Sequence, residues 1–152
     1  MHRMAGTNIP HLEIALIADY RSTYSQLGYS ENDDCAALPH DGEIQAVSTS
    51  LEKLGHHVTL VPGIQPLAQH LAAGDYKYWD LVFNIAQGFY GSARESQVPA
   101  LLEAYQVPYT FADAATMALC QNKALTKVHT PGTSAKPSSL SEDSPLAKLM
   151  SA

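Results

Sequence analysis

The chain has 152 residues, a length typical of one globular domain. Apolar residues make up 45% of it and charged residues 16%, a composition that excludes wholesale disorder and allows a buried core without metals or disulfides. The net charge of −6 provides no basic surface for nucleic acid or anionic lipid, and no apolar run approaches the ~18 residues of a membrane helix. Neither partner is therefore expected. Cys35 and Cys120 form no disulfide framework or zinc motif, which indicates reduced thiols and a cytoplasmic protein.

Short apolar segments alternate along the chain with segments of helical periodicity. Residues 12–18 are mostly apolar, as in a buried parallel strand, and a long polar stretch follows them. Apolar residues at helical spacing then predict a helix that begins near Asp41 and ends at Gly55, with one face made by Ile44, Val47, Leu51 and Leu54. Later segments predict strands at 56–61, 80–85 and 108–111 and helices at 66–73, 97–106 and 114–127.

This order of elements predicts an α/β fold, with an open, mostly parallel, Rossmann-like sheet and helices on both faces. Because ligands of such sheets bind beyond the carboxyl ends of the strands, a site is expected in the loops after Ala18, Val61, Ile85 and Phe111. Residues 12–128 are expected to form this domain, after a flexible N-terminus at 1–11. Half of the residues from 129 to 152 are Ser, Pro, Thr or Gly, which predicts a disordered tail.

The segment from Asn84 to Gln97 is the most informative part of the sequence, because it joins a predicted strand to a predicted helix. Gly88 and Gly91 permit a sharp turn and close approach of the backbone to a ligand, so at least one of them is expected at positive φ. The spacing matches neither a dinucleotide-binding fingerprint nor a P-loop. From the spacing alone, a purely structural glycine turn and a ligand-binding loop both remain open.

Several stretches in order and at matching spacing resemble the D-alanine–D-alanine ligase family of ATP-grasp carboxylate–amine ligases. The family has a strand ending in a His-Gly-x-x-Gly loop, a helix that begins near a Gln, an Ile-Pro-Tyr-Thr strand and a helix with an Asp-Lys-x-x-x-Lys pattern. The corresponding stretches here are 81–91, 97–103, 107–111 and 117–127. The resemblance covers roughly Leu12 to Lys127 and is most specific between 81 and 127.

The resemblance implies a pre-ATP-grasp domain, the N-terminal domain that supplies part of the substrate site. In the intact family, ATP and Mg²⁺ convert a carboxylate into an acyl phosphate, which an amine then attacks. The similarity stops near Lys127, and no acidic metal ligands or glycine-rich lid follow it. A truncated ligase, inactive alone and binding neither cofactor tightly, is therefore expected. Its expected partners are an amino acid or small carboxylate substrate, and either a second copy or a separately encoded ATP-grasp domain.

The resemblance also indicates site residues. Gln87 stands where the family often has a substrate-side His, and Gly88 and Gly91 match the loop glycines. Glu43 corresponds to a family Glu that holds a substrate ammonium, although the Gly-Gly-x-Ser-x-Glu pattern before it is absent; a carboxylate in a first helical turn is also favoured by the helix dipole alone. Lys123 matches the lysine that reaches toward nucleotide phosphate, although an isolated helical lysine is usually only solvated. No catalytic residue and no metal ligand are expected.

Two other functions compete with this interpretation. A non-catalytic binding or assembly module is consistent with the absence of ATP-grasp motifs. A phospho-receiver domain has a similar alternating plan, and Asp19 fits its acidic cluster after the first strand. However, Asp80 begins the third strand instead of following it, and residues 84–91 contain no Asp. His56 and His57, adjacent in a predicted strand, point to opposite faces and are expected to have structural roles.

The tail generates one prediction from composition alone. Deleting residues 129–152 is expected to leave the melting temperature within a degree or two, because few apolar residues there are able to pack on the domain. Differential scanning calorimetry of the full and shortened chains measures this. A loss of many degrees would show that the tail belongs to the folded core.

Overall fold

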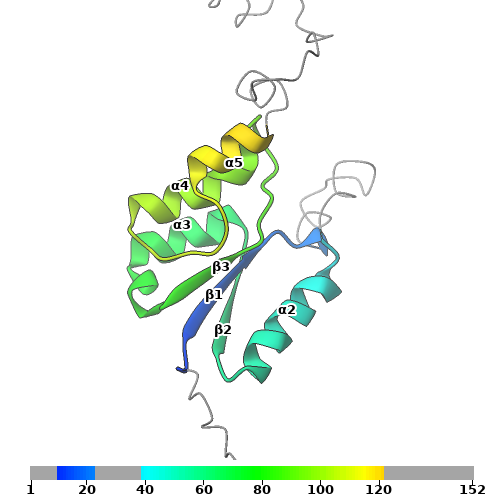
Figure 1. The fold of residues 1–152 in the computed structure, drawn as a ribbon, viewed down its shortest axis with the longest axis vertical. Helices are drawn as coiled ribbons and strands as arrows, with labels where there is room; N and C mark the ends of the chain where they lie inside the picture. The colour runs from blue at the N-terminus through cyan, green and yellow to red at the C-terminus, as the bar shows by residue number, and fades with distance from the viewer. Residues whose placement is uncertain (1–9, 23–38, 122–152) are drawn as a thin grey trace, which may run out of the picture.

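The computed structural model describes residues 10–22 and 39–121, which form an α/β fold (Figure 1). Its three parallel strands are β1 (Glu13–Ala18), β2 (His57–Pro62) and β3 (Leu81–Asn84), in the order β2-β1-β3. The helices are α2 (Asp41–Lys53), α3 (Ile64–Ala73), α4 (Gln97–Ala104) and α5 (Ala114–Gln121), with short 3₁₀ turns η1 (Asp75–Tyr78) and η2 (Arg94–Ser96). The predicted fold class is confirmed. The predicted tail and residues 122–127 of the last predicted helix lie outside the described residues.

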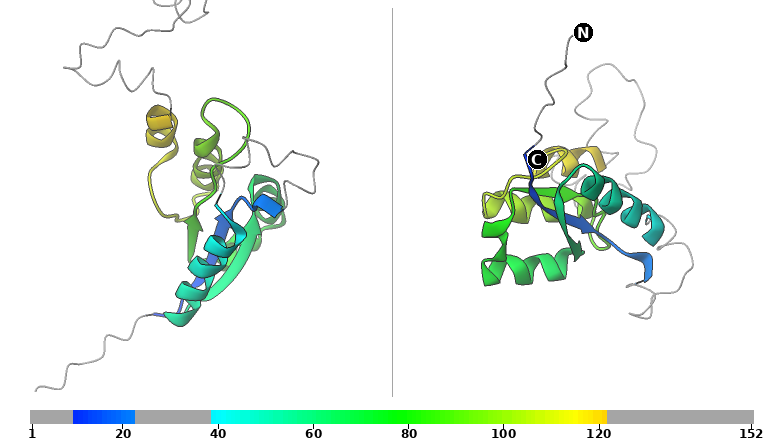
Figure 2. Two further views of the ribbon diagram at one scale, coloured as in Figure 1. Left: turned by 90° about the vertical axis from the view of Figure 1, so that its right-hand side faces the viewer. Right: turned by 90° about the horizontal axis from the view of Figure 1, so that it is seen from below.

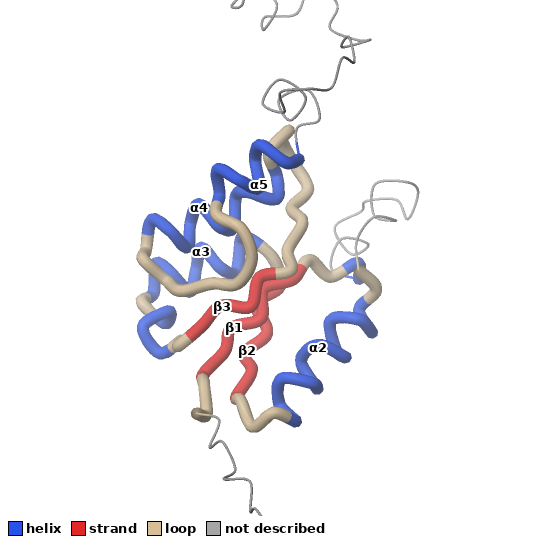
Figure 3. The backbone as a smooth tube through the Cα atoms, viewed as in Figure 1, coloured by secondary structure: helices blue, strands red, loops and turns tan. Residues whose placement is uncertain are grey.

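The central strand β1 explains why the sheet has helices on both faces. Its residues Ile14 to Ala18 are all buried, so both of its faces lie against other elements. Ala15 and Ile17 pack in a cluster with residues of α3 and α4, whereas Leu16 and Ala18 pack against Ile44 of α2. Figures 2 and 3 show α2 on one side of the strands and α3 and α4 on the other.

The chain reverses its direction across the sheet at β1. From β1 it passes through α2 to β2, and from β2 it returns through α3 to β3, on the other side of β1. In open parallel sheets such a reversal leaves a crevice beyond the carboxyl ends of the two strands concerned. The segments that follow β1 and β3 are therefore the ones that the fold places at a ligand site.

The predicted fourth strand at 108–111 is wrong. The segment makes only one bridge to the sheet, between Val82 and Tyr109. Val82 N donates to Pro108 O at 2.8 Å, and Thr110 N donates to Val82 O at 2.9 Å. The pairing ends there because Pro108 has no N–H and because Phe111, at φ 77°, leaves the extended conformation.

No helix in the described part of the chain is long and apolar enough to cross a membrane.

A small polar cluster fixes this last segment to α4 and α5. The Tyr109 hydroxyl donates to Glu103 Oε1 at 2.6 Å, and Ala114 N donates to the same oxygen at 2.8 Å. The Ala114 amide and the Tyr109 hydroxyl hold the pKa of Glu103 below its usual value. Burial, together with the hydrogen bond to Glu103 and its negative charge, raises the pKa of Tyr109 to about 12. The neutral phenol is thus favoured by folding.

This cluster predicts a stability loss in alkali. A group whose pKa is higher in the folded state stabilises the fold fully below its unfolded pKa, and the contribution is lost as pH rises toward its folded pKa. The free energy of unfolding is therefore expected to fall more steeply between pH 10 and about pH 12 in the parent than in Tyr109→Phe. Urea unfolding at several pH values, with Tyr78→Phe as an exposed control, measures the difference. Equal slopes in the parent and Tyr109→Phe would contradict the assigned pKa.

Candidate functional site

A buried carboxylate joins the two loops at the carboxyl edge of the sheet. Asp19 follows β1 directly and is only 2% exposed. Its Oδ2 accepts hydrogen bonds from Gln87 N and Gly88 N, both at 2.8 Å. Because a buried charge is costly unless it is hydrogen-bonded, these two amides stabilise the carboxylate, and the carboxylate in turn fixes the start of the loop after β3. The turn at 87–88 is therefore held at the carboxyl edge of the sheet, beside the end of β1.

Both glycines of this loop adopt the left-handed conformation, which confirms the expected sharp turn. Gly88 has φ 67° and Gly91 has φ 93°. A Cβ on Gly88 would also lie 2.7 Å from the backbone oxygen of Arg94, whereas a Cβ on Gly91 would meet only Gln97 Nε2, at 3.6 Å. Gly88 is thus required both by its conformation and by the lack of space, and Gly91 by its conformation alone.

The rest of the loop is held at both ends. Asn84, at the end of β3, is 5% exposed, and its Oδ1 accepts from Ala86 N at 3.2 Å. At the far end, Gln97 Nε2 donates to Tyr90 O at 2.8 Å. Gln97 is the first residue of α4, so the helix itself restrains the loop. A loop fixed in this way is pre-organised, which lowers the entropy lost on binding a ligand.

The first turn of α2 lies at the same edge of the sheet. Ser22 N, four residues after β1, donates to Asp41 Oδ1 at 3.4 Å, and hydrogen bonding with Ser22 holds the pKa of Asp41 below its usual value. His40 caps the helix, since its Nδ1 accepts from Gly42 N at 3.1 Å. Glu43 is exposed in this first turn. The structure therefore brings the exposed Glu43 to the edge that carries Gln87, which is partly buried.

Tyr20 lies next to Asp19 and was not among the predicted site residues. Its hydroxyl is buried and has no hydrogen-bond partner among the described residues. Burial and the negative charge of Asp41 raise the pKa of this phenol. Its ring packs against the cluster on the α2 side of the sheet. Tyr20 therefore has a mainly structural role at this edge, and its hydroxyl lacks a hydrogen-bond partner among the described residues.

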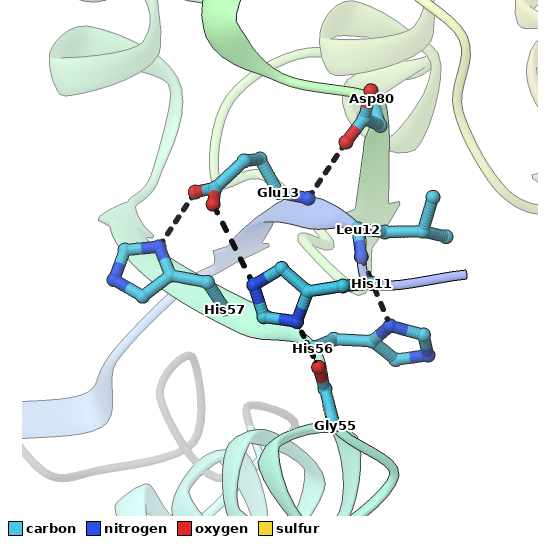
Figure 4. A network of polar contacts seen from close by, with 7 residues as sticks. All are labelled: His11, Leu12, Glu13, Gly55, His56, His57 and Asp80. Carbon is cyan, nitrogen blue, oxygen red and sulfur yellow. Dashed lines mark hydrogen bonds and ion pairs between the residues drawn. The ribbon is translucent and has the colours of Figure 1, made fainter. Parts of the chain in front are cut away.

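The opposite, amino-terminal edge of the sheet carries a separate polar cluster (Figure 4). His57 Nδ1 lies 2.7 Å from Glu13 Oε2, and His11 Nε2 lies 3.9 Å from Glu13 Oε1. Glu13 N donates to Asp80 Oδ2 at 2.8 Å, and Leu12 N donates to His56 Nδ1 at 3.3 Å. These contacts join the first residues of the strands. Within residues 10–22 and 39–121, no three His, Cys, Asp or Glu side chains are grouped so that they would hold a metal ion.

The structure thus brings together part of the predicted site. Gln87, Gly88 and Gly91 share one loop, and Glu43 lies at the same edge of the sheet. Lys123, the predicted nucleotide-binding residue, lies outside the described residues. Asp19 was missed as a site residue. Its signal was present, because an acidic residue directly after an apolar strand stands at the carboxyl edge of the sheet.

Comparisons with known proteins show similarity to one class of ligase. The chain is 37% identical over 81 residues to a D-alanine–D-alanine ligase of Xanthomonas axonopodis pv. citri and, to the same extent, to D-alanine–D-alanine ligase B of Xanthomonas campestris pv. campestris. The matched part of the chain is similar to part of a D-alanine–D-alanine ligase. The matched region is 53% of this chain and 24% of each relative, as fits an N-terminal fragment of a ligase-like protein. No protein-family model matches the chain, and no solved structure matches it significantly.

The loop glycines of this ligase-like domain generate a matched pair of predictions. Gly88→Ala is expected to lower the free energy of unfolding by more than Gly91→Ala, since both positions have positive φ but only Gly88 lacks room for a Cβ. The conformational part is on the order of 1–3 kcal/mol in each. Gly74→Ala, with φ 87° and open space, is the control, and urea unfolding measures all three. A smaller loss in Gly88→Ala than in Gly74→Ala would contradict the loop geometry.

Asp19 generates a second prediction. Asp19→Ala leaves two partly buried amides without their acceptor, at a cost of roughly 1–3 kcal/mol for each unsatisfied group, so a large loss of stability is expected. Asp80→Ala is the control, because exposed Asp80 accepts from a single amide that water is able to satisfy. Hydrogen exchange of Gln87 and Gly88 is expected to accelerate in Asp19→Ala before global unfolding, because alanine has no side-chain acceptor for the two amides. Unchanged exchange at these amides would show that Asp19 does not hold the loop.

Proposed function

We propose that this chain is the substrate-side domain of an ATP-dependent carboxylate–amine ligase of the D-alanine–D-alanine ligase type. The observation that carries the proposal is the loop at 86–91, which Asp19 holds at the carboxyl ends of β1 and β3, in a chain that matches part of two such ligases. Crevices at this position of an open parallel sheet are where ligands bind.

The charges at this edge favour the ammonium group of an amino acid. Asp41 and Glu43 lie in the first turn of α2, and Glu43 is exposed. A carboxylate at that position attracts a cation, and an ammonium donates up to three hydrogen bonds. Gln87 adds a side-chain amide that both donates and accepts, but it does not supply the acid–base chemistry of a histidine at neutral pH. We therefore assign Glu43 and the 87–91 loop to substrate binding and no residue to catalysis.

ATP and Mg²⁺ serve the full-length family, but the described residues do not fit them. No grouping of acidic side chains among these residues would hold a metal ion, and Glu43 and Asp41 would repel a triphosphate. We place both cofactors on the part of a ligase that lies outside the match, and from the family resemblance we assign Lys123 to nucleotide binding. The chain alone then binds an amino acid without turning it over, and it acts with a separate ATP-grasp polypeptide or in a dimer.

Binding of the substrate is expected to be weak and local. Titration of the ¹⁵N-labelled chain with D-alanine is expected to shift the amide signals of residues 86–91 and of the first turn of α2, with a dissociation constant in the millimolar range, on the order of 4 kcal/mol. Glu43→Gln is expected to abolish the shifts. Glu52→Gln, an exposed substitution near the other end of the same helix, is expected to leave them unchanged. Absence of any shift in the parent would favour the binding or assembly module instead.

A further inference from the structure

Arg94 lies directly beside the loop that the proposed function assigns to the substrate. A Cβ built on Gly88 would lie 2.7 Å from the backbone oxygen of Arg94 and 3.1 Å from its Cβ, so the two residues approach this closely because Gly88 has no side chain. Gly88 N in turn donates to Asp19 Oδ2 at 2.8 Å. The side chain of Arg94 therefore starts at the carboxyl edge of the sheet, where β1 ends.

The backbone around Arg94 is held by α5. Glu95 N donates to Gln121 Oε1 at 3.2 Å, and Gln121 Nε2 donates to Glu95 Oε1, also at 3.2 Å. The Ser96 hydroxyl closes the same turn by donating to Ala93 O at 2.7 Å. These contacts fix the position from which Arg94 extends, so less entropy is lost when the residue binds a ligand.

Arg94 has no counter-ion within the part of the chain that the structure describes. The residue is partly buried, yet its side chain forms no ion pair or hydrogen bond with another described residue. A charge that loses part of its hydration is costly unless a partner replaces the water. A guanidinium presents parallel N–H donors that match the two oxygens of a carboxylate. The chemistry of Arg94 thus favours an anionic ligand with two oxygens.

The other lysines and arginines of the described residues are less well placed for such a ligand. Lys53 ends α2 and Lys77 lies in η1 just before β3, so both lie toward the amino-terminal edge of the sheet. Arg21 follows β1 at the carboxyl edge, but it already takes part in an interaction within the chain. Arg94 is therefore the cation best placed to meet an anion at the loop at 86–91.

An amino acid requires a cation at this edge if Glu43 holds its ammonium. Both charged groups of an α-amino acid are attached to one carbon, so the carboxylate is brought near the first turn of α2 together with the ammonium. The negative charges of Asp41 and Glu43 in that turn repel it. A guanidinium on the same edge offsets the repulsion, and Arg94 supplies one.

We propose that Arg94 binds the carboxylate of the amino acid whose ammonium Glu43 holds. The site then selects a zwitterionic α-amino acid over an amine or an amino-acid amide, because these ligands lack the negative charge. The inference rests on the proposed function and adds a specificity-determining residue to it. Arg94 binds and orients the ligand, and no proton transfer or bond formation is assigned to it.

The test compares D-alanine with D-alaninamide, which has the same ammonium and methyl group but a neutral carboxamide. Titration of the ¹⁵N-labelled full chain, followed through the amide signals of residues 86–91, is expected to give a dissociation constant roughly tenfold lower for D-alanine. Arg94→Gln keeps the Cβ that packs beside Gly88 and is expected to bind the two ligands about equally. Arg21→Gln, at the same edge, and Lys77→Gln, at the opposite edge, are expected to retain the preference.

A second measurement needs no variant and so does not depend on the folding of Arg94→Gln. The Nε–H signal of Arg94 in the parent chain is expected to shift on addition of D-alanine and to stay in place with D-alaninamide. The reason is that a carboxylate forms charge-assisted hydrogen bonds with a guanidinium, whereas a carboxamide brings no charge.

Three results would overturn the inference and leave the proposed function standing, provided that D-alanine still shifts the loop signals of the parent. The first is equal affinity of the parent for D-alanine and D-alaninamide. The second is an undiminished preference for D-alanine in a folded Arg94→Gln. The third is an Arg94 Nε–H signal that responds to neither ligand. A parent chain whose loop signals respond to neither ligand would refute the proposed function together with this inference.

Discussion

The candidate site depends on the two hydrogen bonds that the Asp19 carboxylate accepts from Gln87 N and Gly88 N. This carboxylate lies at the end of the fully buried strand β1, and it orders the loop after β3 by accepting hydrogen bonds from two successive amides. A buried carboxylate needs donors, and a sharply turned loop needs acceptors for its inward-facing amides, so each satisfies the other. In the proposed function, the loop ordered in this way contributes Gln87 and the glycine backbone to substrate binding.

The fold was readable where burial alone determines the structure. Strand β1 was predicted from an apolar run, and helix α2 from apolar residues at helical spacing. Both predictions succeed because burial of apolar side chains determines these two elements. The prediction of a strand at 108–111 failed because backbone geometry, and not burial, determines the structure of this segment. Its composition suits a strand, but Pro108 lacks a donor and Phe111 adopts a left-handed conformation that nothing in its side chain predicts. Local backbone geometry of this kind is set by neighbours in space.

The candidate site divides in the same way. Positive φ at Gly88 and Gly91 was predictable, because a strand that turns sharply into a loop needs residues without a Cβ. The contacts of Asp19 were not, because they join residues 68 and 69 positions apart, and the sequence shows the acid and the amides without their proximity. Glu43 came from a family pattern, and the structure adds that the first turn of α2 is joined to the segment after β1 through Ser22 and Asp41.

Acidic residues at the two edges of the sheet have different contacts. This difference bears on the proposal that the domain binds the amino acid and another unit binds the phosphates. At the amino-terminal edge, the Glu13 side chain is about half exposed, and its carboxylate lies beside the imidazoles of His57 and His11. At the carboxyl edge, Asp19 is met by backbone amides, while Glu43 remains exposed at the start of a helix. An accessible carboxylate attracts ammonium and repels phosphate. The proposed function assigns the amino-acid end of a ligation reaction to this edge, in a chain with a net charge of −6, and therefore requires a second, phosphate-binding unit to supply the energy of the bond.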